Sequence, residues 1–148
     1  MSNLYLRKAE LSDVDLYYEW ANDPVVRSNS FNTAHIPYED HVNWFNKVLK
    51  RDDIVLFVLM EDDKAVGQIR ISITDAVAEI SYSISSEFRG KGYGGKIVSL
   101  LIERIKDEMP DIKTVSARVK PDNAASLKVF EREGFAEKEV VFELNVRE

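Results

Sequence analysis

The sequence predicts a mixed α+β domain, with a twisted, mostly antiparallel sheet of six to seven strands flanked by about four helices. Three observations indicate this class. Two segments with helical spacing of apolar residues follow a short first strand, three strand-like segments then come in succession, and the second half alternates helix and strand. The 148 residues contain no internal repeat or linker, so we expect one domain over residues 1–148.

The first half is expected to begin with a strand at 4–9 and to continue with two helices. Ser12 and Asp15 resemble a capping box that opens the first helix, and Pro24 is expected to end it. The second helix begins at Pro37, because proline suits the first turn of a helix.

The rest of the chain is expected to form three strands and then alternating helices and strands. The strands are expected at 54–60, 69–73, 80–84 and 114–119, the helices at 94–109 and 123–133, and one or two final strands at 135–146.

Composition excludes several classes of site. The net charge of −6 argues against nucleic acid as a partner, since such binding needs a basic surface. No apolar run is long enough to span a membrane, and the first residues lack the apolar region of a signal peptide, so we expect a cytoplasmic protein. Cysteine is absent, and the only histidines are His35 and His41, so we expect no metal site. We expect His41, in the first turn of its helix, to lie on the surface.

A glycine-rich loop, "RGKGYGGK" at 89–96, can be interpreted in three ways, each of which binds phosphate. A dinucleotide fold is disfavoured because the next strand is not followed closely enough by an acidic residue. A P-loop is disfavoured because Ile97 stands where Ser or Thr would bind Mg²⁺. The third pattern, R-x-x-G-x-G at the start of a helix, provides backbone N–H groups and basic side chains without a metal. Such a site suits the pyrophosphate of coenzyme A.

A second motif, "NAASLKVFEREGF" at 123–135, follows the next strand. The residues that meet the two patterns are Arg89, Gly92 and Gly94 in the first, and Asn123, Ser126, Gly134 and Phe135 in the second. Together, and in this order, they resemble the GNAT superfamily of acyl-CoA-dependent N-acyltransferases. The resemblance covers nearly the whole chain and implies the GNAT fold.

The resemblance also implies a binding site for acetyl-CoA. The strand around Ile84 would pair with the pantetheine arm, and nearby N–H groups would polarise the thioester carbonyl. The residues expected to bind the cofactor are Ile84, Arg89, Gly90, Lys91, Gly92, Tyr93, Gly94, Gly95, Asn123, Ser126 and Phe130.

The expected catalytic residues are Glu79 and Ser126. Many members of the superfamily carry Tyr at the position of Phe130, where it protonates the departing thiolate, and phenylalanine has no proton to donate. Ser126 or water then donates the proton, or the thiolate leaves unprotonated. Glu79 is the candidate general base, with a solvated or salt-bridged strand residue as an equal alternative.

The segment 19–31, with "HVNWF" at 41–45, resembles nucleotide-sugar N-acetyltransferases of the pseudaminic-acid type and, more loosely, enzymes that acetylate ribosomal protein N-termini. Trp20, Asn22 and Arg27 are therefore expected to bind the acceptor, although such tryptophans are more often core residues and such arginines more often ion-pair partners. The expected acceptor is a small amine, free or nucleotide-linked amino sugars being favoured over protein N-termini and polyamines. The sequence is compatible with a homodimer and with a non-catalytic module that binds acyl-CoA.

Overall fold

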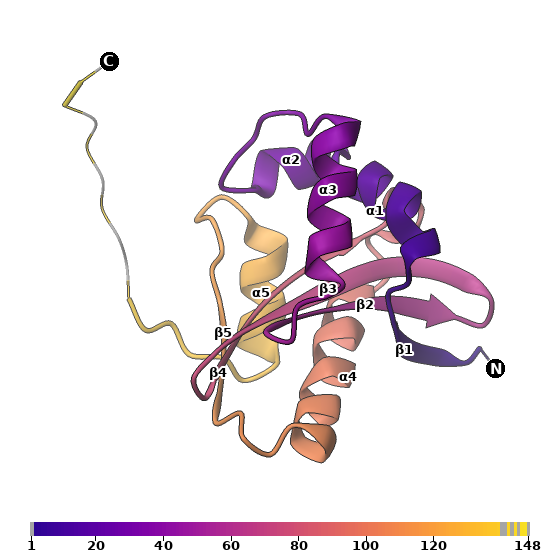
Figure 1. Cartoon of the computed structure of the whole chain (residues 1–148). Helices are drawn as coiled ribbons and strands as arrows, with labels where there is room; N and C mark the ends of the chain where they lie inside the picture. Colours follow the sequence, from indigo (N-terminus) through magenta and orange to yellow (C-terminus); the bar gives the residue numbers. More distant parts are fainter. Residues whose placement is uncertain (1, 140–141, 143, 145, 148) are drawn as a thin grey trace.

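The chain folds around one five-stranded sheet with helices on both faces (Figure 1). A computed structural model describes residues 2–139, 142, 144, 146 and 147. The strands, in spatial as well as chain order, are β1 (Leu4–Lys8), β2 (Ile54–Glu61), β3 (Lys64–Thr74), β4 (Val77–Ile84) and β5 (Thr114–Ala117). Neighbouring strands are antiparallel, except that β4 and β5 are parallel.

The described residues form five α-helices and two short 3-10 helices. The α-helices are α1 (Val14–Ala21), α2 (Pro24–Asn29), α3 (Tyr38–Val48), α4 (Tyr93–Glu108) and α5 (Ala124–Arg132); the 3-10 helices are η1 (Leu11–Asp13) and η2 (Ser86–Phe88).

The core lies on both faces of β2. Phe57 and Leu59 pack with residues of α4 on one face, while Leu56 and Val58 pack with residues of α1 and α3 on the other. A strand buried on both sides needs a continuous apolar sequence rather than an alternating one, which is why residues 54–60 are apolar throughout.

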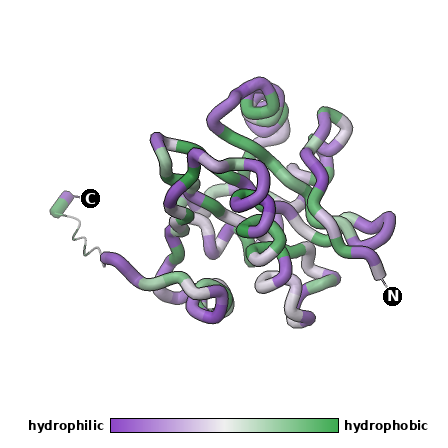
Figure 2. Tube along the Cα trace, turned by 90° about the horizontal axis from the view of Figure 1, so that it is seen from below, coloured by the Kyte–Doolittle hydropathy of each residue, from purple (hydrophilic) through white to green (hydrophobic). Residues whose placement is uncertain are grey.

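The expected six to seven strands are not matched, because the structure has no strand in the described residues after α5. One or two strands were expected at 135–146, but the described residues that follow Phe135 extend away from the body of the molecule (Figures 1 and 2). Positions 140, 141, 143 and 145 lie outside the described residues. Phe142, Leu144 and Val146 are 91%, 84% and 69% exposed. These apolar residues occupy every second position, as in a strand, but that pattern alone does not provide a neighbouring strand to hydrogen-bond with the backbone.

Pro24 begins a helix instead of ending one, which accounts for five helices where about four were expected. Asp23 caps α2: its carboxylate accepts from the N–H groups of Val25 and Val26, at 2.9 and 3.4 Å. Proline follows naturally, because the first helical residue needs no N–H donor.

The turn before α1 is closed by Asp13 rather than by the expected pair of Ser12 and Asp15. The Asp13 carboxylate accepts from the N–H of Glu10 at 2.8 Å and forms a bidentate ion pair with Arg7 at 2.8 and 2.9 Å. The hydrogen bonds from Arg7 outweigh burial, and the pKa of Asp13 is lowered.

His41 is buried, at 2% exposure, and so contradicts the expected surface position. Its Nε2–H donates to the Val14 carbonyl at 2.9 Å, and its ring stacks on Phe45. Burial lowers the pKa of His41, so the side chain joins α1 to α3 as a neutral donor. None of the helices in the described part of the chain combines the length and apolar character needed to cross a bilayer.

Candidate active site

The strand β4 loses its neighbour β5 halfway along its length. Parallel pairing with β5 ends at Ile80 and Ala117, whereas antiparallel pairing with β3 continues to Ile84. Residues 81–84 therefore have one paired edge and one unpaired edge. The unpaired edge includes Ile84, around which the strand was expected to pair with the pantetheine arm.

Backbone alternation shows which groups face the unpaired edge. Ser85 N–H donates to the Val66 carbonyl at 2.8 Å, in register with the β3–β4 pairing. Because bonded and non-bonded pairs alternate in an antiparallel ladder, residues 81 and 83 also bond to β3, while the N–H and C=O groups of Tyr82 and Ile84 face away from it. The Ile84 carbonyl accepts from Nε of Arg89 at 3.1 Å. The remaining groups can pair with an extended chain of amides.

The glycine loop that follows ends in the N-terminus of α4. Gly90 and Gly92 have φ of 76° and 84°, which favours glycine, and Gly92 is the N-cap residue of α4. No side chain caps this end, so the N–H groups of Tyr93, Gly94 and Gly95 have no partner within the helix. Three such amides at the positive end of a helix are the kind of arrangement that can bind phosphate.

The side chain of Arg89 is held inside the protein rather than directed by the loop toward solvent. It forms an ion pair with Asp23 at 2.9 Å, and so joins the glycine loop to the start of α2. Burial alone would raise the pKa of Asp23, but the hydrogen bond and charge of Arg89 outweigh it and the pKa is lowered. The guanidinium of Arg89 is thus engaged by Asp23 and by the Ile84 carbonyl.

Other side chains of the loop also have partners. The Tyr93 hydroxyl donates to Glu61 at 2.8 Å, which fixes the start of α4 to the end of β2 and raises the pKa of Tyr93. Lys96 lies over the Tyr93 ring, at 5.2 Å, and Lys91 lies over Phe88, at 5.9 Å.

A pair of hydroxyl groups lies between β4 and α5. The Tyr82 hydroxyl is 3.1 Å from Oγ of Ser126, and the Tyr82 ring meets Phe130 edge to face at 5.9 Å. Phe130 is buried and also contacts Phe135, so it is a core residue of this end of the sheet. Burial raises the pKa of Tyr82, although the hydrogen bond to Ser126 opposes it. Phe130 has no hydroxyl group, but the ring that it meets, that of Tyr82 on β4, carries one.

Gly94 makes room for this tyrosine. A Cβ at residue 94 would lie 3.3 Å from the Tyr82 hydroxyl oxygen and 3.2 Å from Cγ2 of Val129. The sequence pattern therefore has two kinds of glycine: Gly90 and Gly92 for backbone conformation, and Gly94 for close packing.

The motif at 123–126 is a helix cap. Oδ1 of Asn123 accepts from the Ser126 N–H at 3.3 Å, which orders the first turn of α5 and orients Ser126. Tyr82 was not identified as a candidate site residue from the sequence, where it alternates with Ile80 and Ile84 along an expected strand. A tyrosine in such a row needs a partner for its hydroxyl, and this requirement was the available signal.

Glu79 lies on β4 with its side chain exposed, opposite Ser72 of β3 and Ser116 of β5. It forms no ion pair with any residue in the described ranges. Tyr82 lies three positions further along the strand, roughly 10 Å away.

The three residues expected to bind the acceptor have structural partners. Trp20 is 8% exposed and packs on Tyr17. Both ends of the Asn22 amide bond to the backbone of Ile36, at 2.8 and 3.0 Å. Arg27 donates to the carbonyls of Ala21, Asn32 and Ala34 and to Oγ of Ser30. The irregular connection between α2 and α3 has backbone carbonyls that need hydrogen-bond donors, and the side chains of Asn22 and Arg27 provide them.

Comparison with known proteins agrees with this geometry. The acetyltransferase (GNAT) domain family matches residues 3–136. The uncharacterized N-acetyltransferase p20 of Bacillus licheniformis is 26% identical over 147 residues, which covers 88% of this chain and 80% of that protein.

Three solved structures have similar folds. A domain from Methanocaldococcus jannaschii has a TM-score of 0.83 at 23% identity and covers 94% of this chain and 92% of its own. The aminoglycoside acetyltransferase AAC(6')-Ib, solved with coenzyme A and kanamycin, has a TM-score of 0.82 at 21% identity and covers 94% and 87%. The spermidine N-acetyltransferase of Vibrio cholerae, solved with coenzyme A and spermine, has a TM-score of 0.85 at 19% identity and covers 92% and 82%. From the two motifs, the diverging strands and the match over residues 3–136, we conclude that the chain belongs to the GNAT acetyltransferase family.

Proposed function

We propose that this protein transfers the acetyl group of acetyl-CoA directly to a primary amine of a small molecule. The observation that carries the proposal is the unpaired edge of β4 at residues 81–84, which is followed by the uncapped start of α4. An extended chain of amides that ends in a thioester suits the first feature, and a pyrophosphate suits the second. No group of three or more metal-ligating side chains occurs in the described part of the chain.

The residues present fit the donor without help from a metal. The N–H and C=O of Tyr82 and the N–H of Ile84 would pair with the pantetheine amides, and one of these N–H groups would bond to the thioester carbonyl oxygen. The amides of residues 93–95 would bind the pyrophosphate, with Lys91 and Lys96 nearby.

Two proton transfers accompany the exchange of a C–S bond for a C–N bond. Glu79 would accept the proton of the amine through a water molecule, because its side chain is too short to reach an amine beside Tyr82, roughly 10 Å away along the strand. Ser126 would donate a proton to the departing thiolate and recover it from Tyr82, whose raised pKa keeps the phenol protonated at neutral pH. Water would then return a proton to Tyr82 and take the amine's proton from Glu79, which restores both groups. Such a donor contributes about 10²–10⁴-fold to the rate.

The acceptor we favour is an amino sugar, free or nucleotide-linked. The resemblance of residues 19–31 to nucleotide-sugar enzymes supports it, and one structural neighbour is an aminoglycoside acetyltransferase. A polyamine is the main competitor, since another neighbour is a spermidine N-acetyltransferase. A protein N-terminus is the third candidate.

Thiol release from acetyl-CoA tests the proposal, with amino sugars, UDP-amino sugars, polyamines and peptides as acceptors and mass spectrometry of the products. We expect thiol release that depends on the amine, with one acetyl group on the product for each thiol. Binding of acetyl-CoA without release for any amine would indicate a non-catalytic acyl-CoA-binding module instead. Full activity of Glu79→Gln across the pH range would remove Glu79 from the role of base.

A further inference from the structure

One face of the sheet is polar beside the unpaired edge. The side chains that share this polar strand face are those of Gln68, Arg70, Ser72, Glu79, Ser81, Ser83 and Ser116. Apolar residues of α1 and α3 cover β2 on the same side of the sheet, but the cluster that they form contains no residue of β4 or β5. Tyr82 and Ile84 project to the opposite side, toward α4 and α5. The polar strand face is therefore the surface from which an amine can approach residues 81–84.

Arg70 lies in the middle of this face, on β3, directly opposite Ser81. It is half-buried, yet it takes part in none of the ion pairs and side-chain hydrogen bonds formed by the residues that the structure describes. The other half-buried arginines of that part of the chain all have partners. Those arginines are Arg7 with Asp13, Arg27 with backbone carbonyls, Arg89 with Asp23 and Arg104 with Glu108.

The missing partner is not explained by a lack of carboxylates nearby. Glu79 is the diagonal neighbour of Arg70 on the same face, a separation that long side chains can span, and the two form no ion pair. Partial burial removes some of the water that solvates a guanidinium, and without an anionic partner nothing offsets the free-energy cost of that dehydration. Its planar fork matches a carboxylate or a phosphate in bidentate geometry.

We propose that Arg70 binds an oxyanion of the acceptor, so that the acceptor is an amine that also carries a carboxylate or phosphate group. This inference rests on the proposed function. The face then carries a cation at Arg70 for the anion and a carboxylate at Glu79 for the amine. A polyamine would place a second positive charge beside Arg70, which is unfavourable.

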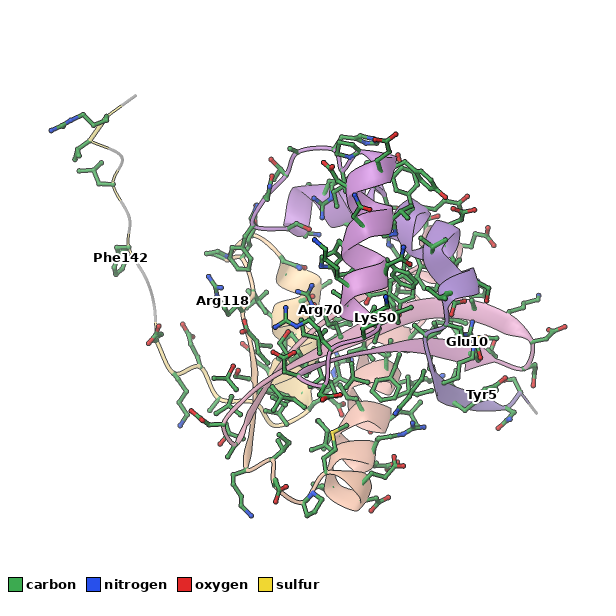
Figure 3. The ribbon with its side chains drawn as sticks, in the orientation of Figure 1. Tyr5, Glu10, Lys50, Arg70, Arg118 and Phe142 are labelled. Carbon is green, nitrogen blue, oxygen red and sulfur yellow. The ribbon has the colours of Figure 1, made fainter. Side chains whose placement is uncertain are left out.

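A second cation lies at the rim of the polar strand face. Arg118 comes two residues after Ser116, and its guanidinium lies 4.7 Å from the centre of the Phe31 ring. Nearby, Nζ of Lys120 donates to the Ser28 carbonyl at 3.1 Å. These contacts bring the end of α2 and the residues just after it to the segment after β5. Figure 3 shows Arg70 and Arg118 on the side of the sheet that carries α3. A large anionic acceptor can thus meet Arg70 and then Arg118.

Matched pairs of acceptors test the proposal. We would measure kcat/KM for glucosamine 1-phosphate against glucosamine, for an amino acid against its amide, and for spermine. The first pair tests phosphate and the second tests carboxylate. The variants are Arg70→Gln, Arg70→Lys and, as a control, Arg51→Gln, because Arg51 is exposed and already has a carboxylate partner in Asp53. Thermal unfolding shows whether each variant is folded.

We expect the wild type to prefer the anionic member of at least one pair. Arg70→Gln should lower kcat/KM for that member by about 10- to 100-fold, the effect of losing a charge-assisted bidentate contact. The neutral member and KM for acetyl-CoA should change little. Arg70→Lys, which keeps the charge but not the fork, should be intermediate.

Two results would overturn the inference while leaving the proposed function intact: a wild-type preference for spermine or for the neutral members, or an equal loss for both members of a pair in a folded Arg70→Gln. If no amine is acetylated, the same pairs are titrated into protein saturated with coenzyme A. Anion-dependent binding that Arg70→Gln abolishes would support the Arg70 site and overturn the proposed function. No binding at all would overturn both.

Discussion

A methyl group at Gly67 should disturb β4 where it is expected to meet the donor. Gly67 lies on β3 opposite Ile84 and is buried. A Cβ there would stand 2.5 Å from the Ser83 carbonyl oxygen, 3.0 Å from Cδ1 of Ile84 and 3.2 Å from Cα of Ile84. Two of these three atoms belong to the backbone, so rotation of a side chain cannot relieve the contact. The end of β4 must move away from β3 by several tenths of an ångström.

The size of the effect follows from that contact. Overpacking of this kind costs about 1–3 kcal/mol. For a domain of this size we expect the melting temperature of Gly67→Ala to fall by about 3–12 °C. Displacement of groups that position a reacting substrate can lower the rate by up to about 10²-fold for 1 Å, so kcat/KM for acetyl-CoA should fall as well.

Thermal unfolding followed by circular dichroism, together with kcat/KM for acetyl-CoA, measures both effects. Gly95→Ala is the matched control for thermal unfolding alone, because the nearest atom to its Cβ is a carboxylate oxygen of Glu133 at 3.8 Å and alanine favours a helix by up to about 1 kcal/mol. Its kcat/KM is not compared, since residue 95 belongs to the proposed pyrophosphate site. A Gly67→Ala protein that melts with the wild type and keeps its kcat/KM would refute the reasoning, since β4 would then tolerate the shift.

Three further predictions concern hydroxyl and charged groups. Tyr82→Phe should lower kcat for thiol release by about 10²-fold or more with little change in KM for acetyl-CoA, since it removes the proton source and keeps the ring; an unchanged kcat would exclude the role. Asp13→Asn should lower the free energy of unfolding at pH 7 by about 1–3 kcal/mol in urea titrations. Because the pKa of Asp13 is lowered in the folded protein by Arg7, its contribution is present above about pH 3.9 and is lost as the pH falls through the folded pKa, so wild type and variant should converge in acid. A difference that persisted unchanged at pH 2 would contradict this assignment. Asp23→Asn keeps a good N-cap but removes the charge opposite Arg89, and a double-mutant cycle with Arg89→Met should give a coupling energy of about 1 kcal/mol; a value near zero would show that the ion pair contributes nothing.

The parts of the fold that could be predicted were those with local causes. Three features follow from residues that are neighbours in the sequence. They are the apolar run of β2, the amphipathic pattern of α4, and the positive φ of Gly90 and Gly92. Pro24 was misinterpreted because a proline is compatible with both the end and the start of a helix, and the choice depends on the preceding Asp23 as a cap. The strands expected at 135–146 are not matched in the described residues. Alternating apolar residues indicate that a strand would have one apolar face, but they do not show that another strand is available to pair with its backbone.

The parts of the site that could not be predicted depend on contacts between distant segments. Tyr82 meets Ser126 across 44 positions of sequence, and Arg89 meets Asp23 across the first half of the chain. Trp20, Asn22 and Arg27 fit a substrate-binding pattern by residue type, but the carbonyls and rings that occupy them became visible only in three dimensions. Residue type indicates what a side chain can bind, and packing decides what it does bind.

The ion pair between Arg89 and Asp23 has a consequence for protein engineering. The segment that contains α1 and α2 and the glycine loop could be exchanged separately between relatives in order to combine the acceptor of one enzyme with the donor site of another. In this protein such a chimera would leave Arg89 half-buried without its carboxylate unless the incoming segment carried an acidic residue at position 23. The segment that contains α1 and α2 should therefore be transplanted together with the glycine loop.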